Sequence, residues 1–542
     1  MFRQEDGEQS RFRSGSSTIA ISQDEPTEAS PLLPTRDTAP PPADGGQTTK
    51  RRRSPLFIMA AMLFMVLLVS FGDQLRQSPE TRIFESIICY RYYEKSDPSK
   101  IKLGRDQVGP GAFGGVDESL CKVDAVQDDL AKLNGYQNFF DGFPFLVLAL
   151  PFGWAADRFG RWPIIFLNLT QFTLKALWNQ LVAWNWQTVD IRAVWASSVF
   201  SLLGGGDIIA TNLFYVTIAD VTLEGGRAAA FLRLAAVNMS ANVVIPPVAA
   251  WLMRRSPWIP LWISTVCLIL AVMVWCVVPE TKNYLHQLSP TNSRPGTPAE
   301  EDTADTLPTD DTESRASIPK RWLTQFKSSV SFLFTDWRIP ALISTFSVHI
   351  LLGQITRLLL QYTSKRYGLS LSESTLVVTI RNAVQVVLLL FILPYLSKAV
   401  IRIYGLCGQK KDLYLGRVSQ LLVGVGWICV AASPNVWFAI GSLAITSLGT
   451  GAGFLIRSFL TSLLPAEQIA RAYSVISMID TLGMMFGSPL LAGLFARGMA
   501  LGGFWVGLPF FFVGLLACFF AGVMFTVTLQ KGEESRSAEA EE

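Results

Sequence analysis

The sequence predicts an all-α integral membrane protein with twelve transmembrane helices in two pseudo-symmetric six-helix bundles. Half of the 542 residues are hydrophobic and only 16% are charged, whereas about 25% of the residues of an ordinary soluble domain are charged. The apolar residues are gathered into twelve runs of roughly 20 residues, which is the length of a helix that crosses the hydrocarbon core of a bilayer. This composition excludes a single soluble domain, and a net charge of +3 gives no indication of nucleic-acid binding.

The two halves of the chain resemble each other weakly. Leu150-Pro151-Phe152 in the first half recurs as Leu393-Pro394-Tyr395 in the second, and the glycine-rich segment 201–207 recurs as 447–453. Weak internal similarity of this kind is typical of a duplicated membrane fold. We therefore expect one six-helix bundle in each half.

The first 54 residues are expected to form a disordered cytoplasmic tail, because they are polar and rich in proline. The tail ends in the basic run 50–53, which keeps the N-terminus in the cytosol by the positive-inside rule. Residues 55–281 then form the first bundle, with a long outer loop at 74–131. Its six helices are predicted at about residues 55–71, 133–152, 163–184, 193–219, 228–253 and 257–278.

Residues 282–337 are predicted to be a cytoplasmic linker between the bundles. Its many proline, serine, threonine and acidic residues cannot bury a core, whereas apolar residues at helical spacing predict an amphipathic helix at about 320–336. Residues 338–528 form the second bundle, and an acidic cytoplasmic tail follows at 529–542. The six helices of this bundle are predicted at about residues 339–362, 372–396, 415–432, 436–464, 470–497 and 504–528.

Two of the seven cysteines, Cys89 and Cys121, fall in the predicted outer loop. Because that compartment is oxidising, a disulfide between them is expected. Two unrelated thiols are the alternative, since spacing alone does not fix the geometry. The other five cysteines have no paired spacing and suit packing, so no metal site is indicated.

A charged segment interrupts two apolar runs at Gly153-Trp154-Ala155-Ala156-Asp157-Arg158-Phe159-Gly160-Arg161. Its charges cannot enter hydrocarbon cheaply, so we interpret it as a tight cytoplasmic turn between the second and third helices. The pattern Gly-x-x-x-Asp-Arg-x-Gly-Arg resembles the signature loop of the major facilitator superfamily, and Pro279-Glu280-Thr281 also ends the sixth helix in many members. Trp162 departs from the family pattern, in which a further basic residue is common.

The resemblance implies that this segment is a conformational latch rather than a substrate site. Gly153 would let a neighbouring helix approach closely, and Gly160 would allow the tight turn. A turn whose charges only set the orientation of the chain is the alternative. The expected gating residues are Gly153, Asp157, Arg158, Gly160, Arg161, Arg227 and Arg471.

Ionisable residues inside the predicted helices are the candidates for substrate binding or proton coupling, because each costs at least about 2.5 kcal/mol at the helix centre. Asp207 follows three glycines and is expected either to carry a proton or to hold helices together by pairing with an arginine. His349 is the only histidine in a predicted membrane helix. It suits a proton relay, a donor to the substrate, or packing.

Three further candidates lie in the second half, at Arg381, Arg457 and Asp480. The arginines are expected to pair with Asp480 or to hold an anionic group of the substrate. Depth along the helices argues against a direct pair between Asp480 and Arg457. Lys175, in the third helix, is expected to make a packing contact to the second helix rather than to take part in substrate chemistry.

The segments 360–368 and 85–93 are similar to a fungal branch of the superfamily that is distantly similar to proton-coupled folate transporters. The resemblance implies alternating access by two rocking bundles, and we expect efflux of a secondary metabolite or toxic compound. Residues 242–249 have the prolines but not the glycines of the Gly-Pro motif found in antiporters of the superfamily. Proton-coupled uptake of a nutrient or vitamin-like solute is therefore one alternative, and a non-transporting, transporter-like sensor is another.

We expect a monomer that binds a small molecule and the lipid bilayer, with protons as a coupling ion and without nucleic acid, cofactor or metal. An enzyme is not expected, because no nucleophile, base and orienting residue recur at catalytic spacing and the chain has only two histidines. The cell membrane is the expected location, with a vacuolar or endosomal membrane as the alternative.

Overall fold

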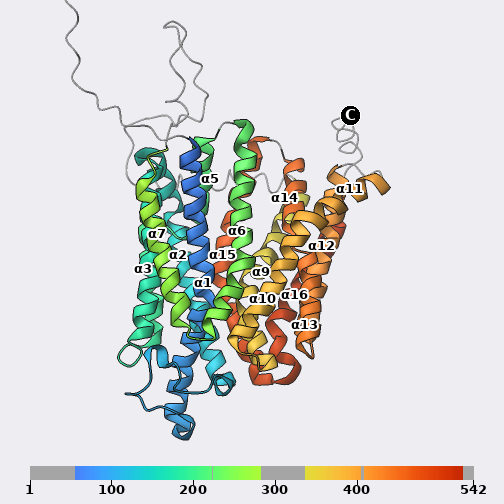
Figure 1. Cartoon of the computed structure of the whole chain (residues 1–542). Coiled ribbons are helices and arrows are strands. Elements are labelled where there is room, and N and C mark those ends of the chain that lie inside the picture. Colours follow the sequence, from blue (N-terminus) through green and yellow to red (C-terminus); the bar gives the residue numbers. More distant parts are fainter. Residues whose placement is uncertain (1–54, 223, 282–335, 405–407, 465, 529–542) are drawn as a thin grey trace, which may run out of the picture. The chain divides into compact units, whose positions relative to one another are not determined.

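The computed structural model describes residues 55–222, 224–281, 336–404, 408–464 and 466–528 (Figure 1). Within these ranges every regular element is a helix, so the expected all-α fold class is confirmed. The two tails and the linker, with the amphipathic helix predicted at 320–336, lie outside the described residues.

The first half contains six membrane-length helical segments, one of which is broken. They are α1 (Pro55–Ser96), α2 (Asp124–Phe159), α3 (Arg161–Trp184), the broken segment formed by η4 (Ile191–Phe200), α4 (Ser201–Gly204) and α5 (Asp207–Val221), then α6 (Glu224–Met253) and α7 (Trp258–Val277).

The second half again contains six such segments among its described residues. They are α9 (Arg338–Tyr367), α10 (Leu371–Val387) continued through a π-helical turn at Leu388–Ile392 into α11 (Leu393–Tyr404), α12 (Gly408–Ala432), α13 (Val436–Leu448) with α14 (Ala452–Leu463), α15 (Ala466–Leu501), and α16 (Leu508–Thr526) preceded by η7 (Gly503–Gly507).

Ten of these described segments are both long and apolar enough to cross a membrane. The remaining two, α2 and α3, have 36 and 24 residues, and a helix of 20 residues already spans about 30 Å. They are long enough but more polar, because α3 carries Asn168, Gln171, Lys175, Asn179 and Gln180. The chain is therefore a multi-pass integral membrane protein.

The prediction that the first helix ends at Phe71 and that an outer loop begins at residue 74 is wrong. α1 continues for 42 residues, and only residues 97–123 separate it from α2. The charges that suggested an exit from the bilayer instead pair along the helix: Arg76 contacts Asp73 at 2.9 Å and Glu80 at 3.0 Å. Residues three and four apart share a helix face, so the helix neutralises its own charges without ending.

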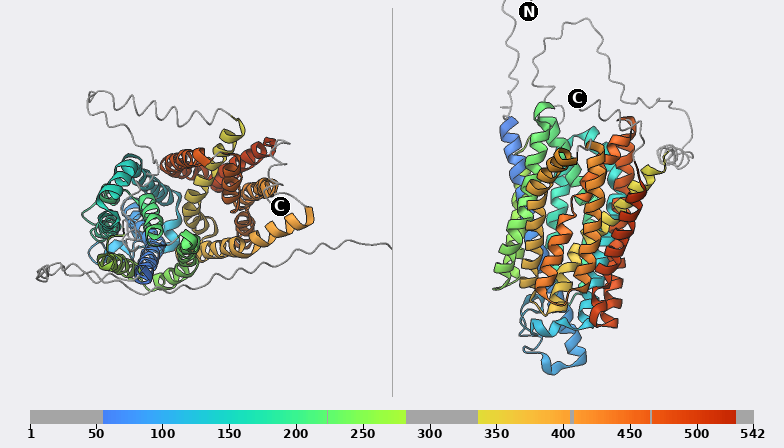
Figure 2. Two further views of the ribbon diagram at one scale, coloured as in Figure 1. Left: turned by 90° about the horizontal axis from the view of Figure 1, so that it is seen from above. Right: turned by 90° about the vertical axis from the view of Figure 1, so that its right-hand side faces the viewer.

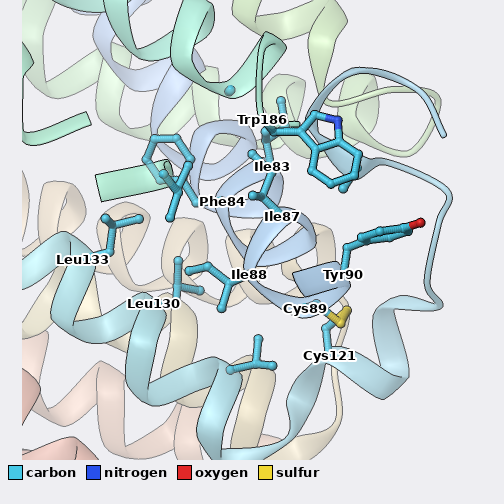
Figure 3. Packing of buried hydrophobic residues seen from close by; sticks show 14 of the residues in the cluster. Ile83, Phe84, Ile87, Ile88, Cys89, Tyr90, Cys121, Leu130, Leu133 and Trp186 are labelled. Carbon is cyan, nitrogen blue, oxygen red and sulfur yellow. A yellow bond between two sulfur atoms is a disulfide. The ribbon is translucent and has the colours of Figure 1, made fainter. Parts of the chain in front are cut away.

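Figure 2 shows the last turns of α1 and the segment 97–123, in blue, continuing past the ends of the neighbouring helices. A hydrophobic cluster packs around these turns, and Figure 3 shows Ile83, Ile87 and Ile88 of α1 together with Trp186 and Leu130. Arg91 donates hydrogen bonds to the carbonyls of Trp186 and Val189, at 2.6 and 2.7 Å. The predicted loop is therefore largely a packed structure.

Cys89 and Cys121 form a disulfide, with their Cα atoms 5.2 Å apart (Figure 3). Both cysteines are fully buried in the cluster around α1. The bond ties the end of α1 to η3 (Glu118–Lys122), directly before α2. Because 32 residues separate the two cysteines, the bond removes considerable freedom from the unfolded chain.

The fourth and tenth predicted helices are both interrupted where the sequence is rich in glycine. Gly205 and Gly206 have φ values of +79° and +87°, a region that residues with a Cβ rarely adopt. The Asn168 amide of α3 donates hydrogen bonds to the carbonyls of Gly204 and Gly206, at 2.8 and 3.0 Å. In the second half, residues 449–451 separate α13 from α14. The repeated glycine segment thus marks the same kind of break in both halves.

Helices of the two halves contact each other closely at α2 and α15, and at α6 and α10. A Cβ at Gly135 would lie 3.1 Å from the Cβ of Ala492, and one at Gly142 would lie 2.4 Å from Met485. Small residues allow such a close approach of membrane helices. Asn138 adds a hydrogen bond across the same interface, to the Ser488 hydroxyl at 2.8 Å.

Replacing both Cys89 and Cys121 with serine is expected to lower the free energy of unfolding by about 2–4 kcal/mol, because the unfolded chain regains the freedom that the cross-link removes. The measurement is the thermal unfolding midpoint of the purified protein in detergent. Reductant should lower the midpoint of the parent protein but not that of the double variant. Equal midpoints for the two proteins in the absence of reductant would contradict this expectation.

Candidate functional site

A cavity of about 640 Å³ lies between the two halves of the chain. Helices α1, α2, α3 and α6 of the first half and α9, α10 and α15 of the second half contribute its lining. Pockets for drug-sized molecules have volumes of about 300–1,000 Å³. The cavity is therefore large enough for a small organic molecule.

The α1 side of the cavity carries a row of charges. Arg76 lies between Asp73 and Glu80, and Glu80 accepts a hydrogen bond from the Asn179 amide of α3 at 2.5 Å. All four residues line the cavity. These charges lie at or beyond the predicted end of the first helix, and they were not among the predicted site residues. Their spacing of three and four residues was the signal that could have identified them.

Lys175 forms an ion pair with Asp141 of α2, with the ammonium and carboxylate atoms 2.5 Å apart. The other oxygen of Asp141 accepts hydrogen bonds from the Ser198 hydroxyl at 2.6 Å and from the Gln137 amide at 3.1 Å. This pairing agrees with the expected packing contact to the second helix and identifies Asp141 as the partner of the lysine. A membrane-embedded charge is stabilised by such a partner.

The second-half side of the cavity carries His349 and Arg357 of α9 and Arg381 of α10. The Arg357 guanidinium donates to the Asn138 side-chain oxygen at 2.8 Å. Arg381 is only 7% exposed; it donates to Asn382 at 3.3 Å and lies 5.9 Å from the centre of the Trp427 ring. Two of the predicted candidates, His349 and Arg381, thus reach the cavity.

His349 packs against Phe346 of the preceding turn, with ring centres 5.9 Å apart. Its imidazole is buried and lies next to the Gln420 side chain. A Cβ at Gly453, just after the second-half break, would lie 3.5 Å from the imidazole. His349 therefore lies where the cavity meets the break in the second half.

Asp480 and Arg457 form an ion pair at 3.6 Å. The prediction that their depths exclude a direct pair is wrong, because the depth of Arg457 was counted along an unbroken helix, whereas α14 begins anew at Ala452. The guanidinium also lies 5.3 Å from the centre of the Phe346 ring. Neither residue lines the cavity. Asp207 begins α5 directly after the first break, and its side chain lies outside the described part of the chain.

The predicted tight turn between the second and third helices is shorter than the segment 153–161 and falls at Gly160. α2 continues to Phe159 and α3 begins at Arg161, so Gly160 alone forms the connection, with φ at +100°. The Glu280 carboxylate accepts hydrogen bonds from the backbone N–H groups of Arg161 and Trp162, at 2.9 and 3.1 Å. An acidic side chain at a helix N-terminus satisfies free N–H groups and complements the helix dipole.

The predicted gating residues are described only in part. Arg161 pairs with Asp220 of α5 at 3.3 Å, and Arg158 is exposed. The side chains of Asp157, Arg227 and Arg471 and the surroundings of Gly153 lie outside what the structure describes. Asp220 and Glu280 therefore join this region as partners that the sequence analysis had not assigned.

A second charged cluster surrounds Glu85, which is fully buried. We call it the Glu85 network; its members are Arg82, Glu85, Glu118, Lys122 and Gln127. Glu85 accepts from the Lys122 ammonium and the Gln127 amide, both at 2.7 Å, and Arg82 contacts Glu118 at 3.1 Å. Buried charges of this kind are tolerated only when every member is paired.

The Glu85 network continues into the second half of the chain. The Glu118 carboxylate accepts a hydrogen bond from the backbone N–H of Leu371 at 2.7 Å. Lys365 of α9 pairs with Asp124 at 2.6 Å and also donates to the Lys122 carbonyl. These contacts join the start of α2 to the connection between α9 and α10.

Comparison with known proteins places the chain among membrane transporters. Residues 139–456 match the family model described as Major Facilitator Superfamily. The chain is 29% identical to "MFS efflux pump atnC" of Emericella nidulans, over 94% of each chain. It is 28% identical to "Efflux pump ustT" of Aspergillus flavus, over 83% of this chain and 84% of that protein.

Solved structures with the same fold include a D-xylose-proton symporter and the nucleoside transporter NupG. The first gives a TM-score of 0.58 at 12% identity and covers 89% of this chain and 99% of that chain. The second gives a TM-score of 0.54 at 11% identity, covering 86% and 98%. At these identities the likeness concerns the fold alone.

Removing one partner of the Lys175–Asp141 pair is expected to destabilise the protein more than removing both. Lys175→Met leaves a carboxylate without its cation, whereas Asp141→Asn together with Lys175→Met leaves a neutral, hydrogen-bonded site. A double-mutant cycle on the thermal unfolding midpoint should give a coupling energy of about 1–3 kcal/mol. Strictly additive effects of the two changes would contradict the ion pair.

Gly160→Ala is expected to destabilise the protein by about 1–3 kcal/mol, because a residue with a Cβ is strained at this φ. The added Cβ would also lie 2.2 Å from the Glu280 carboxylate. The matched control is Gly522→Ala in α16, where a Cβ meets nothing within 4 Å. Both variants are compared with the parent in the same thermal unfolding measurement, and an unchanged midpoint for Gly160→Ala would refute the argument.

Proposed function

Since this chain belongs to the major facilitator superfamily, we propose that it exports a small organic molecule, such as a secondary metabolite or toxic compound, across a membrane by alternating access. The observation that carries the proposal is the cavity between the halves, which is lined by helices from both. A site at the interface of two structural repeats can be exposed to either side when one repeat rocks against the other.

The two bundles proposed to move are residues 55–281 and 338–528. The Glu85 network and the Lys365–Asp124 pair would close the side expected to face outward, because they join the halves there. The Gly160 connection, with Arg161, Asp220 and Glu280, would act as the latch on the cytoplasmic side. Gly153, Asp157, Arg158, Arg227 and Arg471 remain proposed members of that latch.

Export rather than uptake is supported by the relatives named as efflux pumps, which align with this chain along most of both sequences. Protons are the proposed coupling ion, because the cavity holds the carboxylates Asp73, Glu80 and Asp141 beside cations. Protonation of a carboxylate would release its partner and change the pairing in the cavity. The cell membrane is the proposed location and a monomer the proposed functional unit.

The proposal is tested by accumulation assays in a yeast strain that lacks its own drug exporters and expresses this chain. The panel contains toxic organic acids, bases and neutral compounds, and the expected result is lower intracellular accumulation of at least one compound. Gly353→Trp should abolish the difference, because Gly353 lines the cavity and has open space where a side chain would grow. Gly522→Trp, also with open space but outside the cavity, is the matched control.

Each outcome of this assay decides between the candidate functions. Higher accumulation than in cells with an empty vector would instead establish uptake. No difference for any compound, with normal amounts of protein in the membrane, would refute a transporter of these solutes and favour the sensor.

A further inference from the structure

We propose that the transported solute is an organic anion whose acidic group binds between Arg357 and Arg381 on the second-half side of the cavity. This inference rests on the proposed function, because it takes the cavity to be the transport site. It goes further by naming the chemical class of the solute and the residues that recognise it.

The charges in the cavity are distributed unevenly between the two halves. The first-half lining contains both signs, with carboxylates at Asp73, Glu80 and Asp141 and cations at Arg76 and Lys175. The second-half lining contains Arg357 and Arg381 but no aspartate or glutamate among the described residues. The second-half wall of the cavity therefore carries two arginines and, among the described residues, no acidic side chain.

The cations of the first half already have carboxylate partners. Arg76 is held between Asp73 and Glu80, and Lys175 contacts Asp141 at 2.5 Å. Short, charge-assisted contacts of this kind satisfy both groups. A solute anion would have to displace an internal carboxylate to bind there, which makes this side the less favourable place for it.

Within the described part of the chain, the side chains of the two second-half arginines donate hydrogen bonds to neutral groups only. Arg357 donates to the Asn138 amide oxygen at 2.8 Å, and Arg381 donates to that of Asn382 at 3.3 Å. A guanidinium has five N–H donors, so both retain unused donors. Arg357 is exposed and lines the cavity, and the Asp73 carboxylate on the opposite wall attracts it electrostatically.

Arg381 gives the strongest support for an anion site because its side chain is buried. It is 7% exposed, its Nε atom is buried without a hydrogen-bond partner, and Trp427 covers one face of the guanidinium. A buried cation without an anion is costly. An incoming carboxylate, sulfate or phosphate group would remove that cost and could accept two parallel N–H donors from one arginine.

The remainder of the cavity suits an organic body attached to the acidic group. Phe84 of α1, Leu352 of α9, Val378 of α10 and Leu389 of the π-helical turn after α10 also line it. Pockets for organic ligands combine an apolar lining with a few polar groups that fix orientation. A bare inorganic anion would use the arginines but leave this apolar surface without a partner.

The proposal is tested by ligand-dependent thermal stabilisation of the purified full-length protein in detergent. The probes are salicylate and phenylacetate, their matched amides salicylamide and phenylacetamide, the cation benzylamine, and inorganic phosphate. The two carboxylates should raise the unfolding midpoint, whereas the amides and benzylamine should not. Phosphate should act only weakly, because it makes no apolar contacts.

The variants Arg357→Gln and Arg381→Gln should each weaken the response to the carboxylates by about tenfold or more, since each removes a hydrogen bond to a charged group. Arg381→Lys keeps the charge and should retain part of the response, which guards against a general folding defect. Arg402→Gln, at an exposed arginine of α11, is the matched control and should respond like the parent.

Three results would overturn the proposal: no stabilisation by either carboxylate, equal stabilisation by the amides or benzylamine, or an unchanged carboxylate response when both arginines are replaced. Its failure is distinguishable from failure of export. If the yeast cells export neutral or basic compounds and the Arg357→Gln/Arg381→Gln variant still does so, the transporter stands and only the anion assignment falls.

Discussion

The structure depends on pairing charges that lie within membrane-length helices. A single charge at the centre of a membrane helix costs at least about 2.5–3.5 kcal/mol, yet α1 and α2 each carry several and α3 carries Lys175 in its interior. Arg76 is held between two carboxylates, and Lys175 is held by Asp141. These pairs fix how the three helices pack against one another, and they leave a polar wall facing the cavity.

The second half solves the same problem differently. Asp480 and Arg457 form an ion pair away from the cavity. The Arg381 guanidinium instead lies over the Trp427 ring and donates a hydrogen bond to an amide oxygen, not to a carboxylate. The two halves therefore share an arrangement of helices but not a distribution of charge. A duplicated fold provides the cavity, and divergence of the side chains gives its two walls distinct chemistry.

The sequence was sufficient for the fold class and for most helix positions, because runs of apolar residues report directly on membrane crossing. It was insufficient at α1. Charged residues three and four positions apart pair along this helix, so the helix continues where a count of apolar residues alone predicts that it leaves the bilayer. It also missed Asp141 as the partner of Lys175, because the two residues are distant in the chain. The repeated glycines were noticed as an internal echo, but only the backbone reveals them as breaks, at Gly205 and Gly206 and before Ala452.

The length of α1 has a mechanical consequence. A helix of 42 residues is about 60 Å long, roughly twice the hydrocarbon thickness of a bilayer. Its middle carries Asp73, Arg76 and Glu80 on the cavity wall, and its far end is cross-linked through Cys89. Because α1 is one continuous helix, it connects the cross-linked segment 97–123 directly to the charged wall of the cavity.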